Sequence, residues 1–359
     1  MRRYIPKFTA ISFILLIASL IVYRLCIFSP LLSDFVNGTA SVAVRYLLSS
    51  LTCFVPFSIF EILIILSPFI VIFAVASALR SGATATLRVR RVMAILGVVS
   101  LIFISYIYTL GIGYYTTSLS EKTGIEDKRD ISAEELYYTA DILVKRINEH
   151  AEELSLVDGE TVMPYSVDEM SEKLVLAYDK LNDHYSLLTN YRSRVKPVYF
   201  STVMSDLRIS GIYSFFTGEA NVNVEYPDYC LPNTAAHELA HQRGISRENE
   251  ANFVAFLVCI NSDDPYIRYS GYLSLYEYVA SALYRADIEL YQEIRACLSP
   301  VAIADMRAAN AVYKEHEDSV LGRINEKLND AYLKANGTEG IVTYGYVTRL
   351  AVGYYQSEK

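Results

Sequence analysis

Long, nearly unbroken apolar runs mark the first third of the chain, whereas later segments show the shorter periods of helices that pack in water. Three runs, at about residues 8–28, 57–79 and 92–113, approach the roughly 20 residues that a helix needs to cross a bilayer. The segment from Ala40 to Phe54 is apolar but too short to cross. It predicts an amphipathic helix at the membrane surface.

Basic residues flank these runs unevenly. Three precede the first run and four lie between the second and third, but only Arg45 lies between the first and second. Because basic flanks stay in the cytoplasm, the N-terminus is expected there, and three crossings place everything after about residue 116 outside. No small-residue cleavage site follows the first run, so we expect it to stay attached. The basic residues concerned are Arg2, Arg3, Lys7, Arg80, Arg88, Arg90 and Arg91.

Composition and charge agree with a membrane anchor followed by an outer domain. Of the 359 residues, 52% are hydrophobic and 20% are charged, which excludes a disordered chain. Residues 1–118 carry a net charge of +7, and residues 119–359 one of −15. We therefore predict a multi-pass cell-membrane protein with an anchor over 1–118, in contact with the lipid bilayer, and an extracytoplasmic domain over 119–359. The overall charge of −8 gives no support to nucleic-acid binding.

Helix signals dominate the outer domain. Ser132 and Ser166 are each followed by a Glu three residues later, which is the pattern of a capping box. Residues 211–216 and 220–226 predict the two strands of a small hairpin. The expected fold class is mainly α, with three transmembrane helices followed by a mostly helical α+β domain. Its helices are expected over 133–154, 167–186, 201–209, 233–243, 247–261, 267–297, 300–335 and 343–356.

The residues His237-Glu238-Leu239-Ala240-His241 form an H-E-x-x-H pattern on one of these helices. Two His four residues apart lie on one helical face, so both imidazoles can hold one metal ion. The Glu after the first His faces the open side of the metal, where it can deprotonate a water molecule. The pattern therefore predicts one Zn²⁺ per chain, with His237 and His241 as ligands and Glu238 as general base.

A catalytic zinc site needs a third protein ligand. The other His are scattered along the chain, so a carboxylate on the following helix is expected. Glu248 and Glu250 both lie in the first turn of that helix. Because the helix is apolar on nearly every face, its periodicity does not choose between them.

The motif and the segment after it resemble the Glu-zincin metallopeptidases, whose third ligand is a Glu on the next helix. In the similar ImmA/IrrE-type group this Glu begins an E-A-N segment, which corresponds here to Glu250-Ala251-Asn252. The resemblance implies a zincin-like fold with Glu250 as the third ligand and Asn252 beside the site. More of the chain resembles the uncharacterised bacterial DUF3810 family of membrane-anchored H-E-x-x-H proteins. The matching stretches are 211–213, 217–223, 237–244, 250–253, 268–272 and 344–346, together with the three apolar runs.

The activity implied by the zincin resemblance is hydrolysis of a peptide or protein substrate outside the cytoplasm. Zincins commonly add a His, Tyr or Arg that stabilises the oxyanion. No His is suitably placed, so the candidates are Tyr213, Tyr269, Tyr272 and Arg243. Arg243 is also expected to pair with a carboxylate such as Glu248.

The predicted hairpin immediately before the metal-binding helix offers an edge strand on which an extended peptide can dock. Glu219 and Asn221 lie on this hairpin. They either line the substrate cleft or form the turn.

A non-catalytic receptor or sensor that keeps a structural or ligand-binding metal is the alternative. Glu238 favours the enzyme, because a structural site needs no general base. An intramembrane protease of the site-2 type is disfavoured, since the H-E-x-x-H helix is short and flanked by polar residues.

Overall fold

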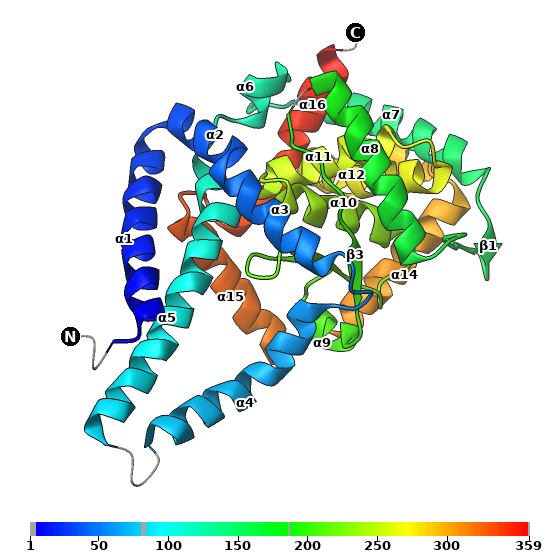
Figure 1. Cartoon of the computed structure of the whole chain (residues 1–359). Helices are drawn as coiled ribbons and strands as arrows, with labels where there is room; N and C mark the ends of the chain where they lie inside the picture. The colour runs from blue at the N-terminus through cyan, green and yellow to red at the C-terminus, as the bar shows by residue number, and fades with distance from the viewer. Residues whose placement is uncertain (1–4, 80–83, 186, 358–359) are drawn as a thin grey trace. The chain divides into compact units, whose positions relative to one another are not determined.

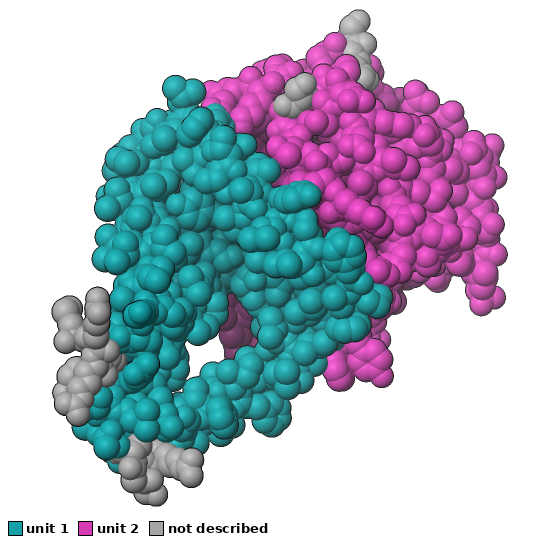
Figure 2. All heavy atoms as spheres, viewed as in Figure 1, with its two compact units in different colours: residues 1–116, 214–219 teal, residues 117–213, 220–359 magenta. Residues whose placement is uncertain are grey.

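The computed structural model describes residues 5–79, 84–185 and 187–357, which are mainly helical (Figure 1). The chain divides into two compact units (Figure 2). Unit 1 comprises Met1–Thr116 and Ser214–Glu219, and unit 2 comprises Thr117–Tyr213 and Ala220–Lys359. The division lies close to the expected boundary, but the hairpin turn belongs to unit 1. Arg2, Arg3 and Arg80, which contribute to the expected orientation, lie outside the described residues.

Unit 1 contains three helices that are long and apolar enough to cross a membrane, which confirms the three apolar runs. They are α1 (Lys7–Phe28), α4 (Ile59–Leu79) and α5 (Ala85–Thr109), the last continued by the 3₁₀ helix η1 (Gly111–Tyr115). None of the most apolar stretch of α4 is buried. Large exposed apolar surfaces of this kind indicate membrane association.

Two shorter helices connect α1 to α4. The sequence predicted α3 (Ala40–Thr52) but not α2 (Pro30–Gly38). The buried side of α3 is polar and includes Arg45, whose guanidinium donates two hydrogen bonds of 2.8 Å to Asn37. The apolar residues Leu47 and Leu51 are exposed instead. The polar side of α3 therefore faces the protein and its apolar side faces outward. This arrangement is typical of a helix in apolar surroundings, where polar groups must bond to other groups of the protein.

The hairpin turn is fixed by hydrogen bonds inside unit 1. The Ser105 hydroxyl donates to the Phe215 carbonyl over 2.6 Å. The buried carboxylate of Glu219 accepts from the backbone N–H groups of Ile59 (3.1 Å) and Phe60 (2.7 Å) at the beginning of α4. A negative charge stabilises a helix N-terminus. Glu219, expected either to line a substrate cleft or to form the turn, therefore makes a structural contact.

Unit 2 is a helical bundle around one apolar core. Nearly every residue of α11 (Glu248–Ile260) is buried. α10 (Cys230–Gln242) and α12 (Pro265–Ala286) pack against it. α7 (Ala133–Ala151) packs on α12, and α8 (Val167–Tyr185) packs on α11. Both expected capping boxes are confirmed, because Ser132 and Ser166 each exchange hydrogen bonds with the Glu three residues later. A short helix, α6 (Leu119–Thr123), begins the unit.

Two long helices expected from the sequence are each broken in two. Asp287 separates α12 from α13 (Ile288–Ala296) by accepting hydrogen bonds from the first N–H groups of α13. Ser319 does the same for α15 (Val320–Ala335), which follows α14 (Pro300–Glu315). Apolar periodicity continues across both breaks, so only the caps distinguish two helices from one. The chain ends with the 3₁₀ helix η2 (Ile341–Tyr346) and α16 (Val347–Ser357).

A three-stranded sheet has the order β3-β5-β4. The expected hairpin is confirmed by β4 (Gly211–Ser214) and β5 (Glu219–Asn223), which are neighbours. β3 (Val195–Val198) runs parallel to β5 and was not predicted, because Pro197 argues against a strand. The short helix α9 (Ser201–Asp206) follows β3. A second sheet pairs β1 (Leu156–Val157) with β2 (Glu160–Thr161).

Candidate metal centre

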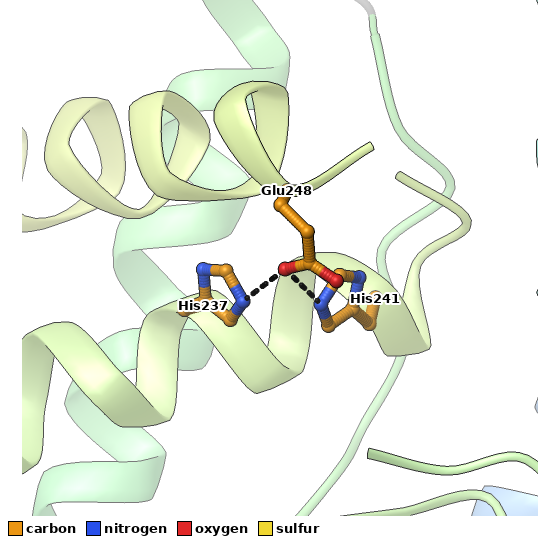
Figure 3. A group of neighbouring side chains, drawn as sticks. All are labelled: His237, His241 and Glu248. Atoms are coloured by element: carbon orange, nitrogen blue, oxygen red, sulfur yellow. Dashed lines mark ion pairs between the residues drawn. The ribbon is translucent and has the colours of Figure 1, made fainter. Parts of the chain in front are cut away.

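The turn after α10 brings the beginning of α11 beside the two His of the motif. Gly244 has a φ of +98°, which favours glycine, and the N–H of Ile245 bonds back to the carbonyl of Ala240 over 3.1 Å. This left-handed turn satisfies the last carbonyls of α10 and reverses the chain. Glu248, the first residue of α11, then faces His237 and His241 (Figure 3).

Three ligand atoms converge at this point. Glu248 Oε2 lies 3.2 Å from His237 Nε2 and 3.4 Å from His241 Nε2 (Figure 3). The donor atoms of the three residues lie within 4.8 Å of one another, and no other such group occurs within the described ranges. Glu248 Oε2 is buried and accepts no well-aligned hydrogen bond, as expected of an oxygen that a cation would satisfy. Two imidazoles and one carboxylate match the donor set of a catalytic zinc.

The backbone selects the ring nitrogen that His241 presents. Its Nδ1 lies 2.7 Å from the carbonyl oxygen of Ile245, to which only a protonated nitrogen can bond. Nε2 of the neutral ring is therefore the nitrogen with a lone pair, and it faces Glu248. A backbone partner of this kind orients metal-binding imidazoles in general.

Charge and burial act in opposite directions on the pKa values of the centre. Burial lowers the pKa of His241, but the Glu248 carboxylate outweighs it and raises this pKa to about 9. Burial raises the pKa of Glu248, but the imidazoles of His241 and His237 hold it well below its usual range. The metal-free centre therefore binds a proton near neutral pH, and an incoming cation has to displace that proton.

Zinc affinity is accordingly expected to rise with pH, by about tenfold per pH unit between roughly pH 6.5 and 8.5, because one proton leaves His241 for each ion bound. The stability of the metal-free fold is expected to change in the opposite direction and to fall as the pH rises. The raised pKa of His241 stabilises the fold below its unfolded value of about 6.5, and this contribution is lost as the pH rises towards 9. Competition of the full-length protein with a zinc-sensitive dye across this range checks the slope. A flat profile would contradict proton displacement.

Glu250, the third ligand implied by the resemblance, points away from the two imidazoles. Its Oε1 accepts hydrogen bonds of 2.9 Å from the backbone N–H of Leu119 and from Arg247 Nη1. Two residues along a helix correspond to a rotation of about 200°, so Glu248 and Glu250 face opposite sides of α11. The expectation that Glu250 joins His237 and His241 is therefore corrected: Glu248 faces the two imidazoles, and Glu250 fixes the beginning of α6.

Glu238 is buried beside the centre and is held by β4. Burial raises its pKa, against the opposing effect of the two imidazoles, and the backbone N–H of Tyr213 donates to its carboxylate. A Cβ on Gly211 would lie 2.7 Å from Glu238 Oε1 and 2.7 Å from Thr234 Cγ2, so only glycine allows β4 to approach α10 so closely. Tyr213, expected as a side-chain donor, thus contacts the centre through its main chain.

The two tyrosines expected from α12 are held in structural contacts. The hydroxyl of the buried Tyr269 donates to Asp305 Oδ2 over 2.7 Å, and the Thr161 hydroxyl donates to the same oxygen over 2.8 Å. Tyr272 stacks on His150 with a ring separation of 5.7 Å. The interpretation of Tyr269 as an oxyanion donor is therefore corrected, because its only proton is bonded to a buried carboxylate.

Arg243 and Asn221 also have structural partners. Arg243 is buried, donates to Asn190 Oδ1 over 2.8 Å from Nε and 2.6 Å from Nη2, and lies 4.1 Å above the centroid of the Tyr178 ring. The expected pairing with Glu248 is not present. Asn221 Nδ2 donates to the Ile212 carbonyl over 3.1 Å, which joins β5 to β4.

Asn252 reaches the centre through a tyrosine that the sequence did not single out. Its Nδ2 donates to the hydroxyl of Tyr278 over 3.3 Å. Burial and the charges of Glu277 and Glu248 raise the pKa of Tyr278 to about 12. Tyr278 therefore stays protonated at neutral pH, although the Glu248 carboxylate is close enough to act on it.

Tyr344, on η2, is a second tyrosine near the centre. Burial and the charges of Glu248 and Glu238 raise its pKa well above the usual value. Its hydroxyl accepts from Asn329 Nδ2 over 3.4 Å, which leaves the hydroxyl proton available. The region 344–346 carried part of the family resemblance, but among 30 tyrosines the sequence assigns this one no role.

Comparison with known proteins identifies the family without naming an activity. No curated protein and no solved structure matches the chain. The match to one family extends from α3 into α16 and includes the whole candidate metal centre. Residues 40–352 match the family described as protein of unknown function (DUF3810), so the resemblance to that family is confirmed and the chain belongs to it.

Proposed function

We propose that the protein is a membrane-bound, zinc-dependent metallopeptidase of the zincin type. The observation that carries this proposal is Glu238, a buried carboxylate beside a set of three metal donors and not one of them. A structural zinc site is closed by four protein ligands, whereas a catalytic site has three and keeps one position open. Three donors with a carboxylate held next to them favour catalysis over a structural role.

Each residue of the centre would have a different role in peptide hydrolysis. A zinc ion held by His237, His241 and Glu248 would polarise a carbonyl oxygen and lower the pKa of a water molecule to about 7. Glu238 accepts the proton of the attacking water and passes it to the leaving amine. Its raised pKa allows it to hold that proton between the two transfers. The N–H of Tyr213 keeps the carboxylate oriented.

We assign oxyanion stabilisation to Tyr344, because its hydroxyl proton is available and η2, on which it lies, packs on α11, the helix that carries Glu248. Exchange of Tyr344 for Phe is expected to lower kcat by about 10²-fold, the usual effect of removing one oxyanion donor. Zinc content should not change. Tyr346→Phe is the matched control, since its hydroxyl bonds to Glu339 on the same segment. Equal activity of the two variants would remove Tyr344 from the mechanism.

The sheet favours a peptide as the substrate. β4 lies at one edge of the order β3-β5-β4 and directly contacts α10 through Gly211. An extended peptide can add to such an edge by backbone hydrogen bonding, which places its carbonyl groups along the metal-binding helix. Recognition through the main chain would place few demands on the side chains of the substrate.

We further propose that the catalytic unit lies outside the cytoplasm. Among the described residues, Lys7 is the first residue of α1, and Arg88, Arg90 and Arg91 lie in the first turns of α5. Arg45, between α1 and α4, is buried and hydrogen-bonded. The basic flanks thus favour a cytoplasmic N-terminus and a cytoplasmic connection between α4 and α5.

Digestion of a peptide library by the full-length protein in detergent tests the activity, with products identified by mass spectrometry. Cleavage should disappear on chelation, return with zinc and be absent in His237→Ala. Stoichiometric zinc without any cleavage would contradict the proposal and favour a non-catalytic metal-binding receptor.

A further inference from the structure

Helix α15 is attached to the rest of unit 2 by its polar side. Asn325 Nδ2 donates to the Leu207 carbonyl over 2.9 Å, and Asn329 Nδ2 donates to the Tyr344 hydroxyl over 3.4 Å. Gly322 packs so closely on α9 that a Cβ would lie 2.9 Å from the Asp206 carbonyl oxygen. Leu333 is the one large apolar side chain of α15 that is buried.

The opposite side of α15 is apolar and exposed. Val320, Ile324 and Leu328 recur every four residues and are 60%, 51% and 64% exposed, with Leu321 beside them at 49%. This spacing places all four on one face of the helix. Among the described residues of unit 2, α15 and η2 hold six of the sixteen exposed large apolar side chains. We call the residues Val320, Leu321, Ile324 and Leu328 the α15 face.

Basic residues run along one edge of the α15 face. At about 100° per residue, Arg323, Lys327 and Lys334 lie within roughly 60° of Val320 on the same side. All three are exposed. The acidic residues Glu326 and Asp330 lie farther round the helix, where Glu326 bonds to Arg208 and Asp330 bonds to the backbone of Ile341. Asp330 also pairs with Lys334 over 2.7 Å, so Arg323 and Lys327 carry the net positive charge of this edge. An apolar face with a basic edge is the composition of helices that lie in the headgroup region of a bilayer.

We propose that the α15 face docks on the surface of the lipid bilayer, with the basic edge against anionic headgroups. Two observations favour lipid over water or another protein. The same chain carries three apolar helices that indicate membrane association. In addition, α3 of unit 1 shows the same inversion, with Arg45 and Ser49 buried and Leu47 and Leu51 exposed.

This inference does not depend on the proposed peptidase activity. It does have a consequence for that activity, because η2 follows α15 closely and packs on α11, the helix that carries Glu248. A docked α15 face holds the centre close to the headgroups. The substrates favoured by this arrangement are membrane-proximal peptide segments.

Lipid quenching of a fluorophore on the full-length protein in nanodiscs tests the docking. An environment-sensitive label is attached to Leu328→Cys in a Cys297→Ser background, because Cys297 is the exposed native thiol among the described residues. The matched control is Leu176→Cys on α8, where the native leucine is 62% exposed, against 64% for Leu328. The neighbouring Lys173 and Lys180 are paired with Asp264 and Asp263, so the control site carries little net charge. The two sites therefore share the native side chain and its exposure, but only one has an apolar face around it.

Docking predicts blue-shifted emission at position 328 and several-fold stronger quenching by brominated lipids than at position 176. Addition of phosphatidylglycerol should strengthen the effect, and Ile324→Glu should reduce it. Equal, water-like emission at both positions would overturn the proposal. A blue shift at 328 without quenching by lipid would overturn it as well, since the face would then be covered by protein.

Discussion

Exchange of Glu238 for Gln is expected to leave zinc bound and to lower the rate of peptide hydrolysis by about 10²–10⁴-fold, the usual contribution of a general base. The amide has nearly the same shape and can keep its contacts with β4, but it cannot accept the proton of the attacking water. The donor atoms of His237, His241 and Glu248 are unchanged by this substitution. Zinc content and turnover measured on one preparation separate the two effects.

Glu238→Asp is the informative second variant. It keeps the charge but withdraws the carboxylate by one methylene group, so partial activity is expected if distance to the water matters. Glu149→Gln, at an exposed position on α7, controls for the loss of a negative charge. Unchanged hydrolysis by the Glu238→Gln protein would refute the assigned base. Loss of zinc from it would instead show that Glu238 supports the metal site.

The sequence predicted the parts of this molecule that depend on local patterns. Three apolar runs became helices α1, α4 and α5, and the capping boxes at Ser132 and Ser166 formed as expected. The two His of the motif lie one turn apart on α10, as their spacing requires. In each of these cases a few adjacent residues determine the structure, so one sequence is sufficient.

The rest depended on contacts between distant segments. The turn at Gly244 determines which side of α11 faces the two His, and therefore whether Glu248 or Glu250 lies beside them. Because α11 is buried on nearly every side, the periodicity of its apolar residues does not predict that orientation. Tyr344 reaches the centre from a segment almost one hundred residues later, whereas Tyr269 is drawn to the buried carboxylate of Asp305. The polar attachment of α15 is likewise visible only once its neighbours are placed.

Exchange of Glu248 for Ala is expected to weaken zinc binding by about 10²-fold or more, since changes behind the ligands alone cost 10–100-fold. The matched variant is Glu250→Ala, only two residues away on the same helix turn. It should keep about one zinc per chain and lose stability instead, by about 1–3 kcal/mol, because the buried N–H of Leu119 loses its acceptor. Elemental mass spectrometry and thermal unfolding of the full-length protein give both readouts.

The two variants distinguish a metal ligand from a structural carboxylate, because Glu248→Ala is expected to lose zinc and Glu250→Ala is expected to lose stability. Removal of Glu248 also removes the charge that raises the pKa of His241, so this pKa should return towards its usual value and the remaining affinity should depend less on pH. Removal of Glu250 leaves that pH dependence intact, since its carboxylate bonds to Leu119 and Arg247 on the other side of α11. Zinc lost from Glu250→Ala and kept by Glu248→Ala would restore the ligand assignment that the E-A-N resemblance implied. The opposite result establishes that the first residue of α11, and not the third, completes the metal centre.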